Sequence, residues 1–560
     1  RLYQGKIDGA YEAFHKAVWN QAWEVGGYYA LASIDTARGD LARAMDNIDR
    51  SLLANAANLQ SRALKVSLLR GTGRTLEAQA AIDESLSLDK LDFRTMAERY
   101  LLTRSEPDLA AFVSALEGDI QTLLDVAYDL AWTGLCDDAF TLTETCCRQG
   151  EFEYPMVFYT LSWLAWLLGR EEASKMYAVR AEAASYRHCF PARLEEMIVL
   201  EQIIQRSPTS ARAHYYLGNL YYDKKRYEDA IHCWRRSAEL DPTFSIPWRN
   251  LGIAEFNVLH NPEAASRMYE NAFSANPGDA RLLHEWDQLK KRARLASPQE
   301  RLRALDEHRG LVDLRDDLTV EYITLLNQCR QWHRALEHLS QRRFNPWEGG
   351  EGLVSAQHVH AHRSLGREDL EAGNAKSALE HIEAARHYPE NLGEGKHLLT
   401  LERDLDYFSG MAAEQLGDVE LAHRYWRAAA APLMSPGIHS YFQAQALKAL
   451  GNHEAASAVL SKLAEFAEER MNAEPKLDYF ATSLPNMLLF EDDLARHNQI
   501  ESYLLKALVS LGSGDSASAA TLLKKLVVED PNHLFAAETL AWITSEARTV
   551  SEQPDVHPAS

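Results

Sequence analysis

The sequence has little cysteine, and no arrangement of it suits a metal site. Its 560 residues include six cysteines, none of which lies in a CxxC or Cys/His spacing. Thiols without such spacing are typical of a reducing compartment, where cysteine behaves as a small apolar side chain that is usually buried. We therefore predict a cytoplasmic protein with reduced, mostly buried thiols at Cys136, Cys146, Cys147, Cys189, Cys233 and Cys329.

Long hydrophobic runs and a surplus of basic residues are absent too. The longest apolar stretch, YTLSWLAWLLG at residues 159–169, contains Ser162 and is too short to span a bilayer. Lysine and arginine number 59 against 81 aspartates and glutamates, which gives a formal charge of −22. Such a surface repels nucleic-acid phosphates and anionic lipid. We therefore expect no nucleic acid and no membrane among the partners.

Motifs for catalysis and cofactor binding are also lacking. The sequence contains no G-x-S-x-G, P-loop, GxGxxG or protein-kinase signature. The segment HVHAH places only His358 and His362 on one helix face, without an HExxH pattern or a carboxylate partner. We therefore predict no metal, no cofactor and no catalytic residue, and we do not expect this chain to be an enzyme on its own.

What the sequence does contain is a repeat of 34 residues, clearest in SARAHYYLGNLYYDKKRYEDAIHCWRRSAELDP. This interval, with its L-G, Y, A and P positions, is that of the tetratricopeptide repeat, a hairpin of two helices. Small residues let the helices approach closely, an aromatic residue fills the space between neighbouring hairpins, and proline ends the second helix. We expect structural roles for Leu217, Gly218, Tyr221, Ala230, Trp234 and Pro242, and for Gly252, Ala265, Tyr269 and Pro277 in the next copy.

Weaker copies follow the same interval along much of the chain. Small residues recur at Ala10, Ala44 and Ala78, and again at Ala139 and Ala173. Because one helix pair cannot bury its apolar face alone, such pairs stack into a continuous array. The sequence therefore predicts an all-α fold, an α-solenoid (right-handed superhelix) of tetratricopeptide-like helix pairs with irregular insertions. We expect the first helix of each pair to line the concave face.

Breaks in the interval indicate how the chain is divided. In chain order we expect repeats at residues 1–290 (clearest at 211–277), a helical insert between two arrays at 291–317, repeats with two unusual loops at 318–430, C-terminal repeats and a capping helix at 431–546, and a disordered tail at 547–560. In the insert, RDDLT predicts a helix start with Asp317 as its cap. An ion pair of Arg315 would tie the insert to its neighbours.

Two loops rich in glycine and glutamate interrupt the helical pattern. RRFNPWEGGEG, residues 342–352, should finish a second helix at Phe344, and YPENLGEGK, residues 388–396, ends the next one. As structural features the loops would cap helices and set the bend between repeats. As a site they would form a polar pocket with an indole floor, suited to a sugar. The binding residues would then be Arg343, Trp347, Glu348, Glu351, Asn391 and Glu394.

Several long segments resemble one known family. AYEAFHKAVWNQAWEVGGYYALASIDTARGD, YYLGNLYYDKKRYEDAI, WRNLG, EWDQL, RDDLT and the two loops together resemble the tetratricopeptide half of large bacterial proteins of the DUF5107 family. The resemblance implies that a β-sandwich region, similar to sugar-associated galactose-mutarotase-like domains, precedes the repeats and is absent from this chain. It also implies a context of carbohydrate metabolism, without implying a reaction.

We therefore predict a non-catalytic scaffold that mediates protein–protein or interdomain interaction. Its partner would be the N-terminal domain of the full-length protein, another protein or a second copy of itself. Two alternatives stay open: an accessory module of a carbohydrate-active enzyme, whose loops complete a carbohydrate site, and a peptide-binding adaptor that uses the concave groove. Lys224, Lys225 and Arg226 lie at an inter-helix turn, which argues against an adaptor that clamps carboxylates from the groove.

Overall fold

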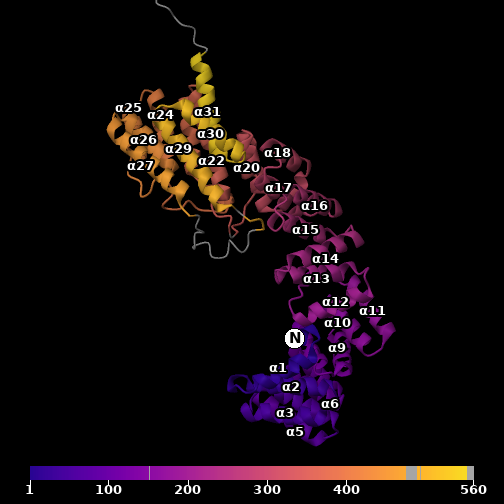
Figure 1. Ribbon diagram of the computed structural model, residues 1–560. Coiled ribbons are helices and arrows are strands. Elements are labelled where there is room, and N and C mark those ends of the chain that lie inside the picture. Colours follow the sequence, from indigo (N-terminus) through magenta and orange to yellow (C-terminus); the bar gives the residue numbers. More distant parts are fainter. Residues whose placement is uncertain (151, 348, 475–488, 492, 552–560) are drawn as a thin grey trace, which may run out of the picture. The chain divides into compact units, whose positions relative to one another are not determined.

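The chain folds entirely into helices within the residues that the structure describes. The structure is a computed structural model, and it describes residues 1–150, 152–347, 349–474, 489–491 and 493–551. Every regular element in these residues is an α-helix or a 3₁₀-helix, which confirms the predicted all-α fold. The chain divides into two compact units, Arg1–Leu251 and Gly252–Ser560 (Figure 1).

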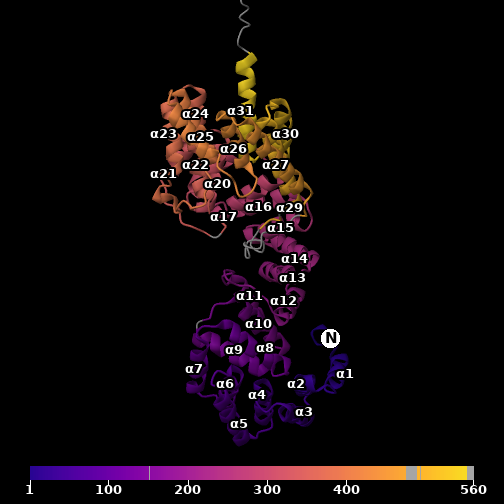
Figure 2. The same cartoon turned by 90° about the vertical axis from the view of Figure 1, so that its left-hand side faces the viewer.

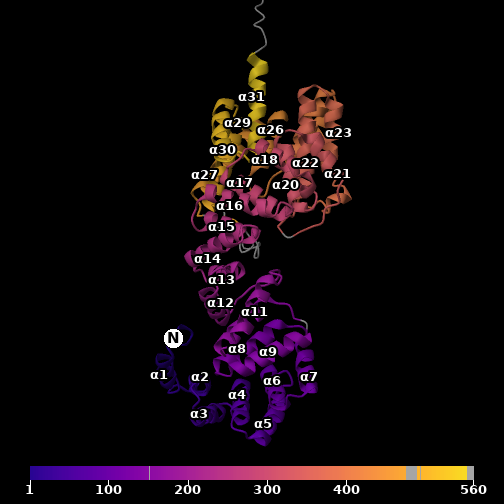
Figure 3. The ribbon, with the colours of Figure 1, turned by 90° about the vertical axis from the view of Figure 1, so that its right-hand side faces the viewer.

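The first unit is a stack of helix pairs in which helices that follow one another in the chain pack side by side (Figure 3). Its elements are η1 Leu2–Gln4, α1 Ile7–Ala17, η2 Gln21–Trp23, α2 Glu24–Ala37, α3 Leu41–Ala54, α4 Leu59–Gly71, α5 Thr75–Leu88, α6 Phe93–Thr103, α7 Glu106–Leu116, α8 Ile120–Trp132, α9 Cys136–Gly150, α10 Pro155–Leu167, α11 Glu171–Ala183, α12 Leu194–Arg206, α13 Ala211–Asp223 and α14 Tyr227–Leu240. The next helix, α15 Ser245–Asn257, contains the boundary between the units.

The second unit continues with the same kind of helix pair (Figure 2). Its elements are α16 Pro262–Ala275, α17 Ala280–Ala293, α18 Pro298–Glu307, α19 Arg309–Val312, α20 Asp316–Gln328, α21 Trp332–Ser340, α22 Leu353–Glu371, α23 Ala375–Arg386, η3 Glu390–Leu392, α24 Arg403–Gln415, α25 Val419–Ala429, α26 Ile438–Ala449, α27 His453–Asn472, α29 Leu494–Gly512, α30 Ser516–Glu529 and α31 Leu534–Ser551. The disordered tail predicted from residue 547 falls mostly on residues 552–560, which lie outside the described residues.

A residue in the left-handed backbone conformation joins the two helices of most pairs. Gly39 and Gly73 have φ values of 78° and 73° in the first unit, and Gly417 has 79° in the second. In the clearest repeat the same place is taken by Lys225, with φ of 60°. Glycine adopts this region freely, whereas a side chain brings its Cβ close to a backbone oxygen. One type of turn therefore recurs in both units.

Close approach of the two helices in a pair depends on a glycine that faces a large side chain. A Cβ built on Gly218 would lie 2.6 Å from Cδ1 of Trp234, and one on Gly252 would lie 2.6 Å from Cδ2 of Tyr269. Both aromatic side chains are buried, and Trp234 Nε1 donates a hydrogen bond to Asn219 Oδ1 at 3.0 Å. Each ring thus fills the space beside the glycine of its own pair, and the Tyr269 hydroxyl also reaches the next pair, where it donates to Glu285 Oε2 of α17 at 3.1 Å.

The other repeat positions singled out in the sequence lie where the pairs pack or where a helix has ended. The buried ones are Leu217, Tyr221, Ala230 and Ala265. Pro242 and Pro277 are exposed and follow the last residues of α14 and α16. The four cysteines at 146, 147, 189 and 233 are buried free thiols, and Cys136 and Cys329 are half-buried free thiols, in agreement with the prediction of mostly buried thiols.

The insert between the arrays is tied to its neighbours by a different arginine from the one predicted. Arg315 forms its ion pair with Asp317, two residues away, at 2.6 Å. Helix α20 begins at Asp316, so the prediction of Asp317 as its cap is wrong, because Asp317 already lies in the first turn. The tie is made instead by Arg301 in α18, whose buried guanidinium binds Asp287 of α17 at 2.5 Å and Glu321 of α20 at 2.6 Å.

In the second unit the last turn and the last helix, α31, pack against helices from much earlier in the chain. Asn532, just before α31, accepts a hydrogen bond on Oδ1 from Arg301 at 2.8 Å and donates one from Nδ2 to the carbonyl of Lys291 at 3.3 Å. Its own carbonyl accepts from Gln328 at 2.6 Å. Helix α31 then packs against α20 and α30. Residues more than 200 positions apart in the chain are thereby held together within this unit.

Candidate functional site

The two glycine–glutamate loops form one structure at the edge of the second unit. The backbone N–H of Phe344 donates to the carbonyl of Asn391 at 2.8 Å. Asn391 Nδ2 in turn donates to the carbonyls of Leu339 and Arg342 at 2.7 and 2.8 Å. A Cβ on Gly393, whose φ is 76°, would lie 3.1 Å from the carbonyl carbon of Phe344, so only glycine allows this contact. The two loops are therefore held against each other by backbone and side-chain hydrogen bonds.

Glu394 caps the helix that follows the first loop. Its Oε2 accepts hydrogen bonds from the backbone N–H of Gly352 at 2.6 Å and from Ser355 Oγ at 3.5 Å, at the start of α22. A carboxylate is stabilised there by free N–H groups and by the helix dipole. Its second oxygen, Oε1, is buried and has no hydrogen-bond partner in the described residues. Glu394 thus caps α22 through Oε2, while its Oε1 makes no hydrogen bond to the described residues.

Of the remaining predicted binding residues in the described part of the chain, only Glu351 lies on the same side of the loops as Glu394. Trp347 is half-buried and folds over Gly350, Arg343 is exposed, and Glu351 accepts a hydrogen bond from the N–H of Gly349 at 2.9 Å. Glu348 lies outside the described residues. Helix α21 ends at Ser340, not at Phe344 as expected, since the chain already turns toward Asn391 there. The predicted indole floor is therefore not part of the hollow described next.

A cavity of about 1090 Å³ opens beside these loops in the second unit. Its wall is formed by the first helices of successive pairs, α22, α24, α26 and α29, together with the segments between helices, the second helix α27 and the last helix α31. The loop residues Glu351 and Glu394 line it, whereas Arg343, Trp347 and Asn391 do not. The aromatic part of its wall consists of Tyr388, Phe442, Phe466 and Phe535.

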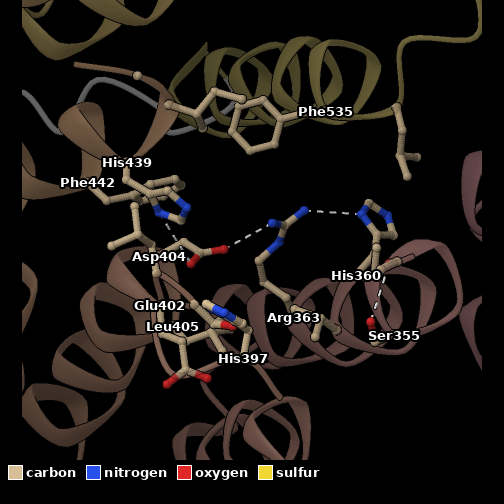
Figure 4. A pocket seen from close by; sticks show the side chains of 18 of the residues that line it. Ser355, His360, Arg363, His397, Glu402, Asp404, Leu405, His439, Phe442 and Phe535 are labelled. Atoms are coloured by element: carbon tan, nitrogen blue, oxygen red, sulfur yellow. Dashed lines mark hydrogen bonds and ion pairs between the residues drawn. The ribbon is translucent and has the colours of Figure 1, made fainter. Parts of the chain in front are cut away.

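A buried cluster around Arg363 forms the floor of the cavity (Figure 4). Arg363 of α22 donates to Asp404 of α24 at 3.0 Å, and its other terminal nitrogen lies 3.5 Å from Glu538 of α31. The same nitrogen donates to His360 Nδ1 at 3.1 Å, and His360 Nε2 lies 2.9 Å from Glu538. Ser364 Oγ also donates to Glu538, at 2.7 Å. Three helices are thus joined by one set of charges.

The charge states of this cluster follow from burial and from its hydrogen bonds. Burial lowers the pKa of His360, so a neutral imidazole donates from Nε2 to Glu538 and accepts on Nδ1 from Arg363. Burial acts to raise the pKa of Glu538, but His360 and Arg363 together hold it well below its usual range. Glu538 and Asp404 therefore neutralise Arg363, and this arginine adds little positive charge to the cavity.

Carboxylates outnumber cations in the wall of the cavity. The lining contains two guanidinium groups, Arg363 and Arg470, and five carboxylates: Glu351, Glu394, Glu402, Asp404 and Glu501. Glu402 is paired with Arg386 at 3.2 Å and with Lys396. The hydrogen bond from His533 lowers the pKa of Glu501. Among the described residues neither Glu351 nor Glu394 forms an ion pair, so the potential on their side of the cavity is negative.

Sequence reasoning missed most of this site. His360 lies within HVHAH, but the helix face that the spacing predicts contains its neighbours His358 and His362. The rings of these two neighbours pack with their centroids 4.7 Å apart. His360 points the other way, into the cavity, and its partner Glu538 lies in the last helix. The one available signal was position: charged residues on the first helix of a pair face the concave side.

The described residues offer neither a metal-binding cluster nor a membrane-spanning helix. Within the described residues no group of three or more His, Cys, Asp or Glu side chains is placed to hold a metal ion. No helix in this part of the chain combines the length and the apolar character needed to cross a membrane.

Comparison with known proteins identifies the repeat type. The family model for the tetratricopeptide repeat matches residues 211–244, which contain α13 and α14. The chain therefore contains a tetratricopeptide repeat at the place where the sequence interval is clearest. Other pairs share its turn and its glycine–aromatic contact, as at Gly410 and Trp426. An α-solenoid of tetratricopeptide-like pairs describes both units.

Three solved structures are similar to this chain at low sequence identity. YrrB, described as a TPR protein with an unusual peptide-binding site, is 16% identical over 42% of this chain and 96% of its own, with a TM-score of 0.16. A tetratricopeptide repeat protein from Parabacteroides merdae is 14% identical over 52% and 98%, with a TM-score of 0.23. The APC/C hetero-tetramer Cut9–Hcn1 is 11% identical over 91% and 94%, also with 0.23. At these TM-scores the likenesses carry no further argument.

Proposed function

We propose that this chain is a protein-interaction scaffold of the tetratricopeptide type, and that the cavity of its second unit holds an extended segment of a partner protein. The observation that carries this proposal is the cavity of about 1090 Å³, which the first helices of four successive pairs line together with the segments between helices. Stacked repeats offer that face to partners because their second helices pack on the outside. The repeat at residues 211–244 supports the same class of protein.

The lining of the cavity suits a polypeptide. Small-molecule sites measure roughly 300–1000 Å³ and are mostly apolar. This cavity is slightly larger and alternates aromatic side chains such as Phe442 and Phe466 with carboxylates and imidazoles. A peptide backbone needs both hydrogen-bonding groups and apolar surface along its length. The wall of this cavity offers both.

A substitution that fills the cavity tests the proposal. Ala356 is exposed on α22 and lines the cavity, so Ala356→Trp should block it while leaving the packed face of the helix intact. The matched control is Ala372→Trp, exposed at the far end of the same helix, roughly 24 Å away. In selections from a phage-displayed random decapeptide library, the natural chain and the control should retain peptides that Ala356→Trp does not. Equal retention by all three would refute a peptide site here.

The resemblance to DUF5107 proteins supports a wider setting for this scaffold: a larger bacterial protein linked to carbohydrate metabolism. A second candidate function, an accessory sugar site, draws support from one observation, that Glu351 and Glu394 line the same cavity as Tyr388 and Phe442. Glycan-array binding by the natural chain that is lost in Glu351→Gln would favour it. Peptide selection without any glycan binding would favour the protein scaffold.

A further inference from the structure

The mouth of the cavity carries exposed leucines. Leu398 is 99% exposed, Leu399 76% and Leu401 47%, and Met434 is fully exposed. Leu401 lines the cavity, Leu398 and Leu399 lie between the lining residues His397 and Thr400, and Met434 precedes the lining residue Ser435. We name these four residues the apolar rim. Single exposed leucines are common on proteins, but four beside one cavity are typical of a surface that a partner covers.

The wall behind the apolar rim is acidic where the loops meet it. Glu351 and Glu394 contact backbone N–H groups, and among the described residues no lysine or arginine forms an ion pair with them. Arg363, deeper in the cavity, already binds Asp404 and Glu538. An incoming anion would be repelled by Glu351 and Glu394, whereas a cation would be attracted to them and would first reach Glu351, which is exposed.

We infer that the segment held in this cavity carries a lysine or arginine next to bulky apolar side chains. The cationic side chain binds the exposed Glu351 and is also attracted by the charge of Glu394, and the apolar side chains cover the apolar rim. The formal charge of −22 on the chain as a whole favours encounter with such a basic partner. This inference rests on the proposed function and adds the chemistry of the partner to it.

The composition of selected peptides tests the inference. From the phage-displayed random decapeptide library, the natural chain should enrich sequences with Arg or Lys adjacent to Leu, Ile, Phe or Met. The same selection on Glu394→Gln should lose the enrichment of Arg and Lys but keep that of apolar residues. Glu380→Gln, an exposed glutamate on α23, serves as the charge-matched control and should leave the enrichment unchanged.

Fluorescence anisotropy with the most enriched labelled decapeptide then measures how much Glu394 and the apolar rim each contribute to the affinity for the peptide. Glu394→Gln should weaken its binding about tenfold, because one of the two negative charges that attract the cation is lost. The double change Leu398→Ser with Leu399→Ser should weaken it by a similar factor, about tenfold. Val528→Ser, on a leucine-free exposed part of α30, controls for the loss of exposed apolar surface and should have no effect.

The outcomes separate the inference from the proposed function. Peptides that are retained by the natural chain but not by Ala356→Trp, and that are acidic or uncharged, would overturn the inference and leave the scaffold proposal standing. Retention of basic peptides that is unaffected by both Glu394→Gln and the leucine changes would overturn it as well. If the natural chain retains no more peptides than Ala356→Trp, both proposals fail together.

Discussion

In each unit one terminal element contacts helices that are distant in the sequence, and we call it the closing element. The two units differ in how deeply this contact is buried. In the first unit the closing element is η1, where Tyr3 donates to Glu195 at 2.8 Å and its ring lies 5.3 Å from that of Trp132, with Tyr3 itself 42% exposed. In the second unit the closing element is α31, whose Glu538 is buried against α22. The same helix pairs can thus be closed by a contact at the surface or by a polar core.

The closing element also determines what kind of hollow a unit can hold. Two cavities in the first unit measure about 200 and 420 Å³ and lie along single helix pairs or between neighbours. The cavity of the second unit is larger because α31 and the two loops add walls that neighbouring pairs alone do not supply. A repeat array therefore gains a deep site by closing on itself, without any change in the repeat.

The largest expected difference between the units concerns their buried arginines. Arg301→Met leaves the buried Asp287 without its ion-pair partner, although Lys291 still binds Glu321 at 3.0 Å, and should cost the second unit about 3–5 kcal/mol of unfolding free energy. Arg94→Met in the first unit should cost less, about 2 kcal/mol, because Arg70 still binds the buried Glu98 at 2.8 Å. Hydrogen exchange read by mass spectrometry for each unit measures both. Equal losses would contradict this account.

Lowering the pH should weaken the second unit more than the first. Burial, with His358 and His381 nearby, lowers the pKa of His362 to about 4, below the value near 6.5 in an unfolded chain. Between those values the unfolded chain binds more protons, so stability falls as the pH drops from about 6.5 towards 4. Burial also lowers the pKa of four other histidines in this unit: His338, His358, His360 and His439. Among the described residues of the first unit, burial lowers the pKa of one histidine, His214.

Urea unfolding at pH 7.5 and 5.0, followed by hydrogen exchange in each unit, checks the pH prediction. His362→Gln should remove on the order of 1 kcal/mol of the loss seen in the second unit, after allowance for solvent screening. The exposed His387→Gln is the control and should leave the loss unchanged. A first unit that loses as much stability as the second would show that the buried imidazoles are not responsible.

The closing contacts themselves should differ by a smaller amount. Asn532→Ala removes two side-chain hydrogen bonds, to Arg301 and to the carbonyl of Lys291, and should cost the second unit about 1–2 kcal/mol. Tyr3→Phe removes one exposed hydrogen bond from the first unit and should cost at most about 0.5 kcal/mol. Thermal unfolding monitored by circular dichroism gives both values. A larger effect at Tyr3 would reverse the comparison of the two closures.

The smallest expected effect concerns the turns within pairs. Lys225 holds a φ of 60° in the first unit, so Lys225→Gly should relieve strain and raise stability by about 0.5 kcal/mol. Gly417 holds 79° in the second, so Gly417→Ala should lower stability by about 1 kcal/mol. Denaturant unfolding curves resolve these values if both variants are compared with the natural chain. If both substitutions changed the stability in the same direction, the backbone conformation at these turns would not explain their effects.

The helix pairs could be predicted from the sequence because their contacts are local. Gly218 and Trp234 lie within one hairpin, and the glycine, the ring and the interval of 34 residues are all visible in the sequence. Glu351 and Glu394 could also be singled out, since a loop of glycines and carboxylates breaks the helical pattern. The sequence does not reveal that Glu394 reaches the cavity whereas Trp347 folds back over Gly350.

The rest of the site depends on contacts between distant segments. Arg363 and Glu538 are separated by 175 positions, and nothing near either residue in the sequence indicates the other. Their meeting depends on how far each successive pair rotates relative to the last, a quantity that small differences in packing accumulate over many repeats. The family resemblance beyond the repeat at 211–244, and its carbohydrate context, stay predictions.

The buried position of Glu538 has a consequence for synthesis of the protein. A ribosome adds roughly 5–20 residues per second, so the 175 residues between Arg363 and Glu538 take roughly 10 to 35 seconds to emerge. During that interval α22 displays an arginine that lacks one of its two carboxylate partners, next to helices with no closing wall. The first unit is synthesised earlier, and its closing element η1 is made before the helices that it contacts. We therefore expect a nascent second unit to expose the helix faces that line the cavity until α31 has been made.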